Sequence, residues 1–101
     1  MDQIATVLKQ ELNKYVTVGF KGRTELTSNQ SETVFTLVTY GQIKGERFTF
    51  TSIIVSLMDE TIIIEVDKNS KPLVDALVQA GIPREQIILA YIGEKVPETL
   101  I

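Results

Sequence analysis

The first hydrophobic residues of the chain recur at the spacing of one helical face, three or four positions apart. This periodicity predicts an amphipathic helix over residues 2–14, with Asp2 as a candidate N-cap. The apolar positions of that face are Ile4, Val7, Leu8, Leu12 and Tyr15.

Four segments after this helix are rich in β-branched and aromatic residues, as strands prefer. Short polar or glycine-containing stretches separate them: a turn at Asn29-Gln30-Ser31, a hairpin loop from Gly41 to Gly45, and a tight turn at Asp59-Glu60. The predicted strands are 23–28, 33–40, 47–58 and 61–66.

The long strand 47–58 changes its hydrophobic parity partway along. Phe48 and Phe50 occupy even positions, whereas Ile53, Val55 and Leu57 occupy odd ones. A regular strand cannot place both sets on one face, so an inserted residue, or bulge, is predicted at Thr51-Ser52. The alternative is that both faces are covered there. The consecutive isoleucines 62–64 of the next strand also indicate cover on both faces.

A second helix begins near residue 72 and has clear signals at each end. Asn69-Ser70 offers an N-cap, and Pro72 suits the first turn. Gly81 suits the left-handed position after the helix end, and Pro83 prevents the helix from continuing. The apolar stripe consists of Leu73, Val74, Leu77 and Val78. A turn at 84–85 and a final strand over 87–92 complete the pattern.

The predicted element order is α-β-β-β-β-α-β. Consecutive strands joined by short turns indicate an α+β fold, with a mainly antiparallel sheet of about five strands and two helices. The length of 101 residues suits a single domain over 1–101, and there is no internal repeat or linker.

The composition of the chain excludes several kinds of functional site. The chain has no Cys, His or Trp, which excludes disulfides, Cys-based zinc sites and imidazole ligands or bases. The net charge is −3, and the ten Lys and Arg residues are scattered, so direct nucleic-acid binding is disfavoured. Lys21/Arg23 and Lys44/Arg47 could meet near loop ends, but solvated turn charges are the favoured interpretation. No apolar stretch suits a membrane span or a leader peptide, so a cytoplasmic location is expected.

Carboxylates, Lys and Tyr are the remaining candidate catalytic groups. Glu65 and Asp67 share a strand face, but Lys68 directly follows Asp67, which breaks the D/E-x-K spacing of nuclease-like metal sites. Asp59-Glu60 lies at the far end of that hairpin. No phosphate-binding glycine loop is present, and no His could activate a serine. We therefore expect no catalytic, cofactor-binding or metal-binding residues, and no enzyme.

The C-terminal segment carries apolar residues without any periodicity. Val96, Leu100 and Ile101 follow Gly93 and Pro97. Two interpretations stay open: a tail that packs on its own domain, which is favoured, and a tail that docks a partner.

The stretch 73–90, LVDALVQAGIPREQIILA, resembles the signature of the XisI family, L-V-x-A-G-[IV]-P-[KR]-x-D-I-V-L-[AG]-F. Thr36 through Gly41 resembles the family's L-L-x-V-G-W strand. The hairpin from Arg47 to Glu65 resembles its H-[IL]-D-I-x-D-G-K-I-W-I-Q pair. The resemblance covers most of residues 1–91, and it implies an XisI-like fold.

The chain departs from the family pattern at several positions. Family tryptophans fall on Gln42 and Ile63, and a frequent histidine falls near Ile54. The H-P-P after the last strand is replaced by Ile92-Gly93-Glu94.

The resemblance implies an accessory role, since these proteins are known as fdxN element excision controlling factors of filamentous cyanobacteria. Such factors act with XisH, which looks nuclease-like, and with a separate site-specific recombinase. The resulting hypothesis is a non-catalytic factor that controls excision of a DNA element by protein–protein contact. Its expected partners are an XisH-like protein, a recombinase, or a second copy of the chain. The alternatives are a direct DNA-binding regulator and a small ligand-binding or carboxylate-based enzyme.

Overall fold

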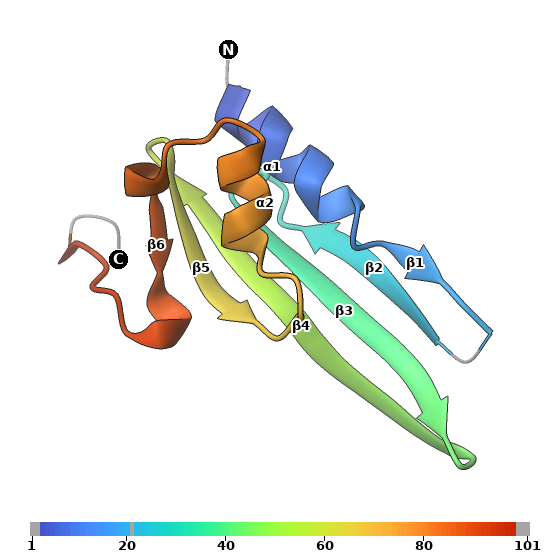
Figure 1. Cartoon of the computed structure of the whole chain (residues 1–101). Coiled ribbons are helices and arrows are strands. Elements are labelled where there is room, and N and C mark those ends of the chain that lie inside the picture. The colour runs from blue at the N-terminus through green and yellow to red at the C-terminus, as the bar shows by residue number, and fades with distance from the viewer. Residues whose placement is uncertain (1–2, 21, 99–101) are drawn as a thin grey trace.

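The computed structural model describes residues 3–20 and 22–98, in which two helices lie against one sheet (Figure 1). The elements are α1 (Gln3–Asn13), β1 (Thr17–Val18), β2 (Gly22–Ser28), β3 (Val34–Ile43), β4 (Glu46–Met58), β5 (Thr61–Asp67), α2 (Leu73–Gln79) and β6 (Ile87–Leu89). Short 3-10 helices, η1 (Arg84–Gln86) and η2 (Ala90–Ile92), flank β6. None of the helices in these residues is long and apolar enough to cross a membrane.

The sheet has six strands in the order β1-β2-β3-β4-β5-β6. Neighbouring strands are antiparallel except β5 and β6, which are parallel because α2 connects them. The predicted α+β architecture is therefore confirmed, with one strand more than expected. The missed strand is β1, whose two residues are too few to show any periodicity. The predicted last strand, 87–92, ends at Leu89, and η2 follows it.

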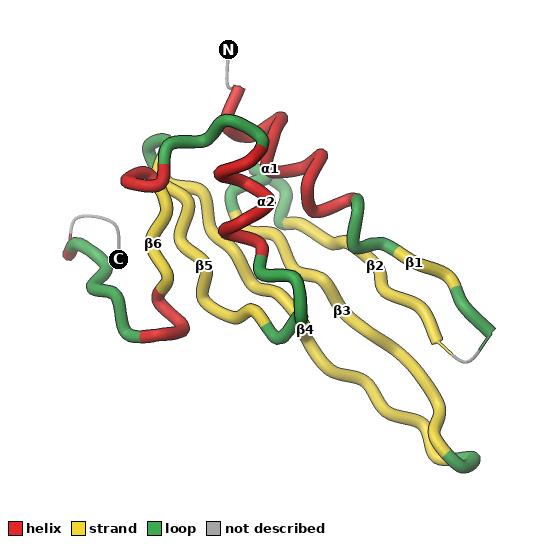
Figure 2. The backbone as a smooth tube through the Cα atoms, in the orientation of Figure 1, coloured by secondary structure: helices red, strands yellow, loops and turns green. Residues whose placement is uncertain are grey.

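The core lies between the helices and one face of the sheet, and Figure 2 shows α1 and α2 together on that face. The predicted helical stripe of α1 is confirmed, since Leu8 and Leu12 are fully buried and Ile4 and Val7 pack beside them. The candidate N-cap Asp2 lies outside the described residues. We call the helix-covered side the core face and the other side the far face. Ile63 is also buried although it belongs to the far face, which confirms the predicted two-sided cover of β5.

The predicted bulge in β4 is confirmed. Leu37 pairs with Ile53 and Val38 pairs with Thr51, so Ser52 is the extra residue. Ser52 is buried and its hydroxyl donates to the backbone oxygen of Leu37 at 3.3 Å. The insertion reverses the parity, which lets the two phenylalanines and the later aliphatic residues share the core face.

Two hairpin turns depend on backbone with positive φ. The predicted Asp59-Glu60 turn is confirmed, with φ of 51° and 65°. The predicted loop 41–45 was too long, because β3 continues to Ile43 and the turn is only Lys44-Gly45, with φ of 52° and 80°. Turns of two residues with positive φ match the twist of the flanking strands, so the strands of both hairpins stay paired up to the turn.

The start of α2 differs from the prediction. Pro72 is the N-cap and makes no side-chain capping bond, and Asn69-Ser70 does not cap the helix. The carboxylate of Asp67, at the end of β5, instead accepts the Leu73 N–H at 2.7 Å. The predicted helix stop is confirmed: Gly81 has φ of 106°, and the N–H of Ile82 reaches the Leu77 oxygen at 3.1 Å.

Candidate partner-binding surface

The β3–β4 hairpin runs well beyond the helices (Figure 1). Buried residues end at Leu37 on β3 and at Ser52 on β4, apart from Gly41. Beyond them lie residues 38–43 and 46–51, with β1 and the start of β2 alongside. We call this region the distal sheet. Neither of its faces is covered by a described helix, so its side chains are available to a partner.

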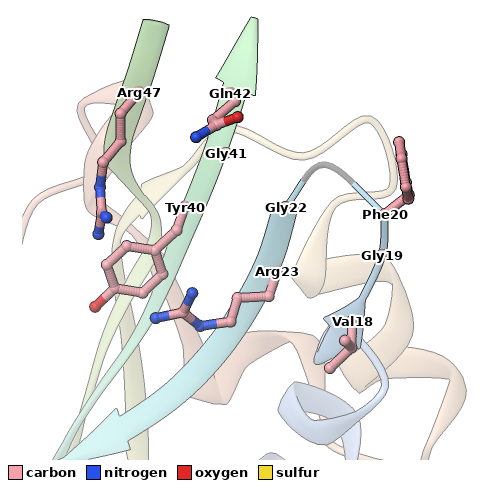
Figure 3. Close-up of a pocket in the computed structure, with 9 residues that line it drawn as sticks. All are labelled: Val18, Gly19, Phe20, Gly22, Arg23, Tyr40, Gly41, Gln42 and Arg47. Atoms are coloured by element: carbon pink, nitrogen blue, oxygen red, sulfur yellow. The ribbon is translucent and has the colours of Figure 1, made fainter. Parts of the chain in front are cut away.

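An arginine–tyrosine cluster occupies the far face of the distal sheet (Figure 3). Tyr40 stands on β3 directly opposite Arg23 on β2, while Arg47 pairs with the nearby Gln42. The Cζ of Arg23 lies 4.2 Å from the centroid of the Tyr40 ring, and the Cζ of Arg47 lies 6.0 Å from it. Both guanidinium groups are within cation–π range, so one ring holds two cations in place.

The cluster lines a shallow cavity of about 250 Å³. Arg23 donates through Nε to the carboxylate of Glu25 on the same strand. In residues 3–20 and 22–98, Arg47 forms no ion pair. Among the residues that the structure describes, the cavity therefore holds two cationic side chains and one carboxylate that pairs with them, in a chain whose net charge is −3.

Exposed apolar side chains border this cavity. Phe20 is 98% exposed and Val18 is 88% exposed, and both belong to the β1–β2 hairpin that forms one wall. On the core face of the same region, Phe48 and Phe50 stack with their centroids 6.1 Å apart. A Cβ at Gly41 would overlap the Phe48 ring, so this glycine allows the ring to lie against the strand. Exposed aromatic and arginine side chains together are typical of protein-binding sites.

The favoured interpretation of the loop-end charges as separate solvated groups was wrong for Arg23 and Arg47. The register of three strands brings them to one tyrosine ring. Lys44 lies in the turn, and Lys21 lies outside the described residues. Strand alternation places Arg23, Tyr40 and Arg47 on the far face. Recognising from the sequence that they meet would also require the register of both hairpins.

The acidic residues near β5 are separated from one another. Asp67 binds the backbone at the start of α2, where it also accepts the Asn69 N–H at 3.0 Å. Glu65 is exposed at the register shift between Ile54 and Val55, and Asp59-Glu60 lies at the opposite end of β5. In the part of the chain that the structure describes, no group of three acidic side chains could hold a metal ion.

Tyr15 belongs to the core rather than to a reactive site. Its hydroxyl donates to the Lys71 backbone oxygen at 2.7 Å, linking α1 to the segment before α2. Burial, and then the nearby Asp67, Glu11 and Asp75 carboxylates, together raise the pKa of Tyr15 to about 12. The hydroxyl is therefore a neutral hydrogen-bond donor at physiological pH.

The outer edge of β6 is closed by its own flanking segments. Arg84 donates through Nη1 to the Ile87 oxygen at 2.7 Å, and the Leu89 N–H donates to Glu94 Oε1 at 2.7 Å. Arg84 and Glu94 also form an ion pair at 3.0 Å. The backbone groups of Ile87 and Leu89 on this outer edge are therefore not free to pair with another strand.

The opposite edge is partly open. β1 pairs only with Arg23 and Thr24 of β2, so residues 25–28 have no partner strand on that side among the described residues. An edge available for pairing therefore lies next to the distal sheet.

At the C-terminus, Val96 is half-buried, whereas Leu100 and Ile101 lie outside the described residues.

The departures from the family pattern have a common location. Strand alternation places Gln42, Ile54 and Ile63 on the far face, opposite the core residues Leu37 and Ile53. The segment that replaces H-P-P supplies Glu94, which closes the β6 edge. The named departures thus lie on the far face and at the β6 edge.

Comparison with known proteins gives a consistent result. A family model described as XisI protein matches residues 1–99. A crystal structure of an XisI-like protein from Anabaena variabilis superposes with a TM-score of 0.70 at 18% identity, covering 96% of this chain and 88% of that one. The fdxN element excision controlling factor XisI of the same organism gives 0.65 at 22% identity, covering 89% and 87%. None of the curated proteins matches the sequence. Because the family model spans nearly the whole chain, the protein belongs to the XisI family.

Proposed function

We propose that this protein is a non-catalytic accessory factor that controls excision of a DNA element by binding a partner protein through the distal sheet. The excision-control role is supported by membership of the XisI family and by the description of its relative from Anabaena variabilis. The observation that carries the binding mode is the uncovered surface around Arg23, Tyr40 and Arg47, bordered by the exposed Phe20. The first candidate partner is an XisH-like protein, and the second is a site-specific recombinase.

Electrostatics favour a protein partner over DNA. Affinity for the phosphate backbone comes from several cations that together release counterions. The two arginines of the cavity are accompanied by Glu25, and the molecule as a whole carries a net charge of −3. A long polyanion would be repelled by most of this surface, whereas a partner protein needs complementarity only over the contact area.

A regulatory role also fits the placement of the carboxylates. The Asp67 and Glu94 carboxylates accept hydrogen bonds from backbone N–H groups and so act in the fold itself. The sequence contains no His or Cys to act as a base or nucleophile near neutral pH. We infer that the chain acts as one domain, in the cytoplasm, and that residues 25–28 of β2 are the segment through which two copies would associate.

The test is binding of the purified chain to the XisH-like protein of its own genome, measured by calorimetry. Phe20→Ser removes a side chain with almost no contacts of its own, so folding should be unaffected, while binding should weaken about tenfold or more. The matched control is Ile92→Ser, which removes a 63% exposed apolar residue next to the opposite sheet edge. If Phe20→Ser bound the partner as tightly as Ile92→Ser, binding through the distal sheet would be contradicted.

Two further measurements separate the competing functions. A gel-shift series across salt should show only weak DNA binding that is lost by about 150 mM salt. Incubation with DNA or RNA, with and without Mg²⁺, should leave the nucleic acid intact. A sequence-specific shift at physiological salt would favour the DNA-binding alternative. Metal-dependent nicking that disappears in a Glu65/Asp67 double alanine variant would favour the enzyme.

A further inference from the structure

We propose that the cavity formed by Arg23, Tyr40 and Arg47 is a carboxylate-binding site that receives one acidic side chain of a protein partner. This inference rests on the proposed function and adds to it the chemistry of the contact. The carboxylate would lie between the two guanidinium groups, above the edge of the Tyr40 ring.

The guanidinium groups are held ready for an anion. Nε of Arg23 is engaged by Glu25, and its Nη atoms make no hydrogen bond or ion pair with another described residue. Arg47 reaches toward the same ring from β4 and likewise has no ionic partner among the described residues (Figure 3). A guanidinium presents its N–H groups as a planar fork that matches a carboxylate, and stacking on a ring reduces the entropy lost on binding.

The charge of the site suits a single carboxylate. Among the described residues, two arginines and Glu25 leave one positive charge in excess, which one Asp or Glu side chain neutralises. Duplex DNA instead presents one negative charge for about every 1.7 Å of helix axis, and most of those charges would face a surface of the same sign. The local excess therefore selects an isolated acid over a polyanion.

The size and border of the cavity agree with this choice. At about 250 Å³ it lies below the usual range for drug-sized ligands, roughly 300–1,000 Å³. Gln42 adds an amide to the lining, while Phe20 and Val18 stand exposed beside it. An acidic side chain entering the cavity would place the flanking backbone of its segment against these apolar groups, which is the composition of a binding hot spot.

The experiment is an NMR titration that follows the Nε–H signals of the arginines. The probes are N-acetyl-glutamate N-methylamide, its glutamine counterpart, inorganic phosphate, and a short DNA duplex. The glutamate probe should shift the Arg23 and Arg47 signals saturably, with Kd on the order of 1–10 mM, and the glutamine probe should not. Absence of a saturable shift, or tighter binding of phosphate or of the duplex than of the glutamate probe, would overturn the proposal.

Variants separate the site from general charge. Arg47→Gln should abolish the saturable shift, whereas Lys68→Gln, an exposed change outside the cavity, should leave it unchanged. Tyr40→Phe keeps the ring and should retain binding, while Tyr40→Leu should weaken it about tenfold because the arginines lose their support. Equal shifts in Arg47→Gln and in the unmodified chain would refute the site.

Binding to the XisH-like protein distinguishes the two levels of inference. If the partner binds Arg47→Gln as tightly as the unmodified chain, the carboxylate site is wrong and the accessory role stands. If the glutamate probe binds as expected but no XisH-like protein or recombinase is bound, the accessory role fails and the site stands.

Discussion

Replacing Gly81 by valine should destabilise the fold through backbone strain alone. Gly81 follows α2 with φ of 106°, a conformation that residues with a Cβ rarely adopt. A Cβ built at this position meets no heavy atom within 4 Å, so the added Cβ causes no steric overlap. The cost therefore measures the left-handed backbone itself.

The expected size follows from the two hydrogen bonds that depend on this conformation. The N–H of Gly81 donates to the Val78 oxygen at 3.0 Å, and the N–H of Ile82 donates to the Leu77 oxygen at 3.1 Å. These bonds, and the buried Ile82, hold the chain in the strained geometry, so valine must adopt it at a cost of about 1–3 kcal/mol. In a chain of this length that corresponds to a fall in Tm of roughly 5–20 °C.

Thermal and urea unfolding followed by circular dichroism would measure the effect. The midpoint in urea should fall with an unchanged m value, because the surface exposed on unfolding stays the same. Gly81→Asn is the matched control, since asparagine tolerates left-handed backbone and should cost less than half as much. A valine variant that melts within about a degree of the unmodified protein would refute the assignment of strain to this residue.

Three other predictions concern side chains that hold the fold together. Glu94→Ala removes the side-chain acceptor of the Leu89 N–H and should open the β6 edge, increasing hydrogen exchange at the Leu89 amide and promoting self-association in ultracentrifugation. The hydrogen bond from the Leu89 N–H, and then Arg84, lower the pKa of Glu94. The contribution of Glu94 to stability should therefore be present above pH 4.5 and be lost as the pH falls through the lowered pKa. Protection of the Leu89 amide from exchange that does not change at acid pH would contradict this. Asp67→Ala should cost about 1 kcal/mol in urea unfolding by removing the acceptor of the Leu73 N–H, and an unchanged midpoint would show that the bond contributes nothing. Because the pKa of Tyr15 is raised, its contribution to stability should be constant below pH 10 and should be lost between pH 10 and about 12. Tyr15→Phe should remove the ionisation step near pH 12 from the absorbance titration.

The two edges of the sheet differ in whether another strand can be added to them. Both outward-facing residues of β6 are bonded within the segment 84–94, which prevents addition of another strand there. The outer side of β2 beyond Thr24 has no such cover among the described residues. Association through strand pairing is thus directed to the side that also carries the arginine–tyrosine cavity, so a partner could use both at once.

Much of the local structure follows from the sequence, because short-range patterns are sufficient to determine it. The spacing of apolar residues defines α1, and Gly81 with Pro83 defines the end of α2. The bulge at Ser52 was predictable for the same reason, since a strand has period two and the buried set changes parity at this residue. These features each depend on residues only a few positions apart.

Tertiary structure decided the features that depend on residues far apart in the chain. The Asp67 carboxylate reaches the start of α2 only because β5 ends beneath it, and Glu94 reaches β6 only because Gly93 turns the chain back with φ of 97°. The two-residue strand β1 has no pattern of its own and exists because β2 offers it an edge. Propensity and periodicity do not contain such information.

The candidate site is the clearest example of this division. Arg23, Tyr40 and Arg47 are visible in the sequence as ordinary surface residues, separated by up to 24 positions. Their meeting depends on the register of β2 against β3 and of β3 against β4, and a slip of one residue would move a side chain to the other face. Local patterns were therefore sufficient to predict both helices, the longer strands and the change in parity. Which charged side chains share one ring depends on the register that tertiary packing imposes, because the alignment of strands in space sets the cross-strand neighbours.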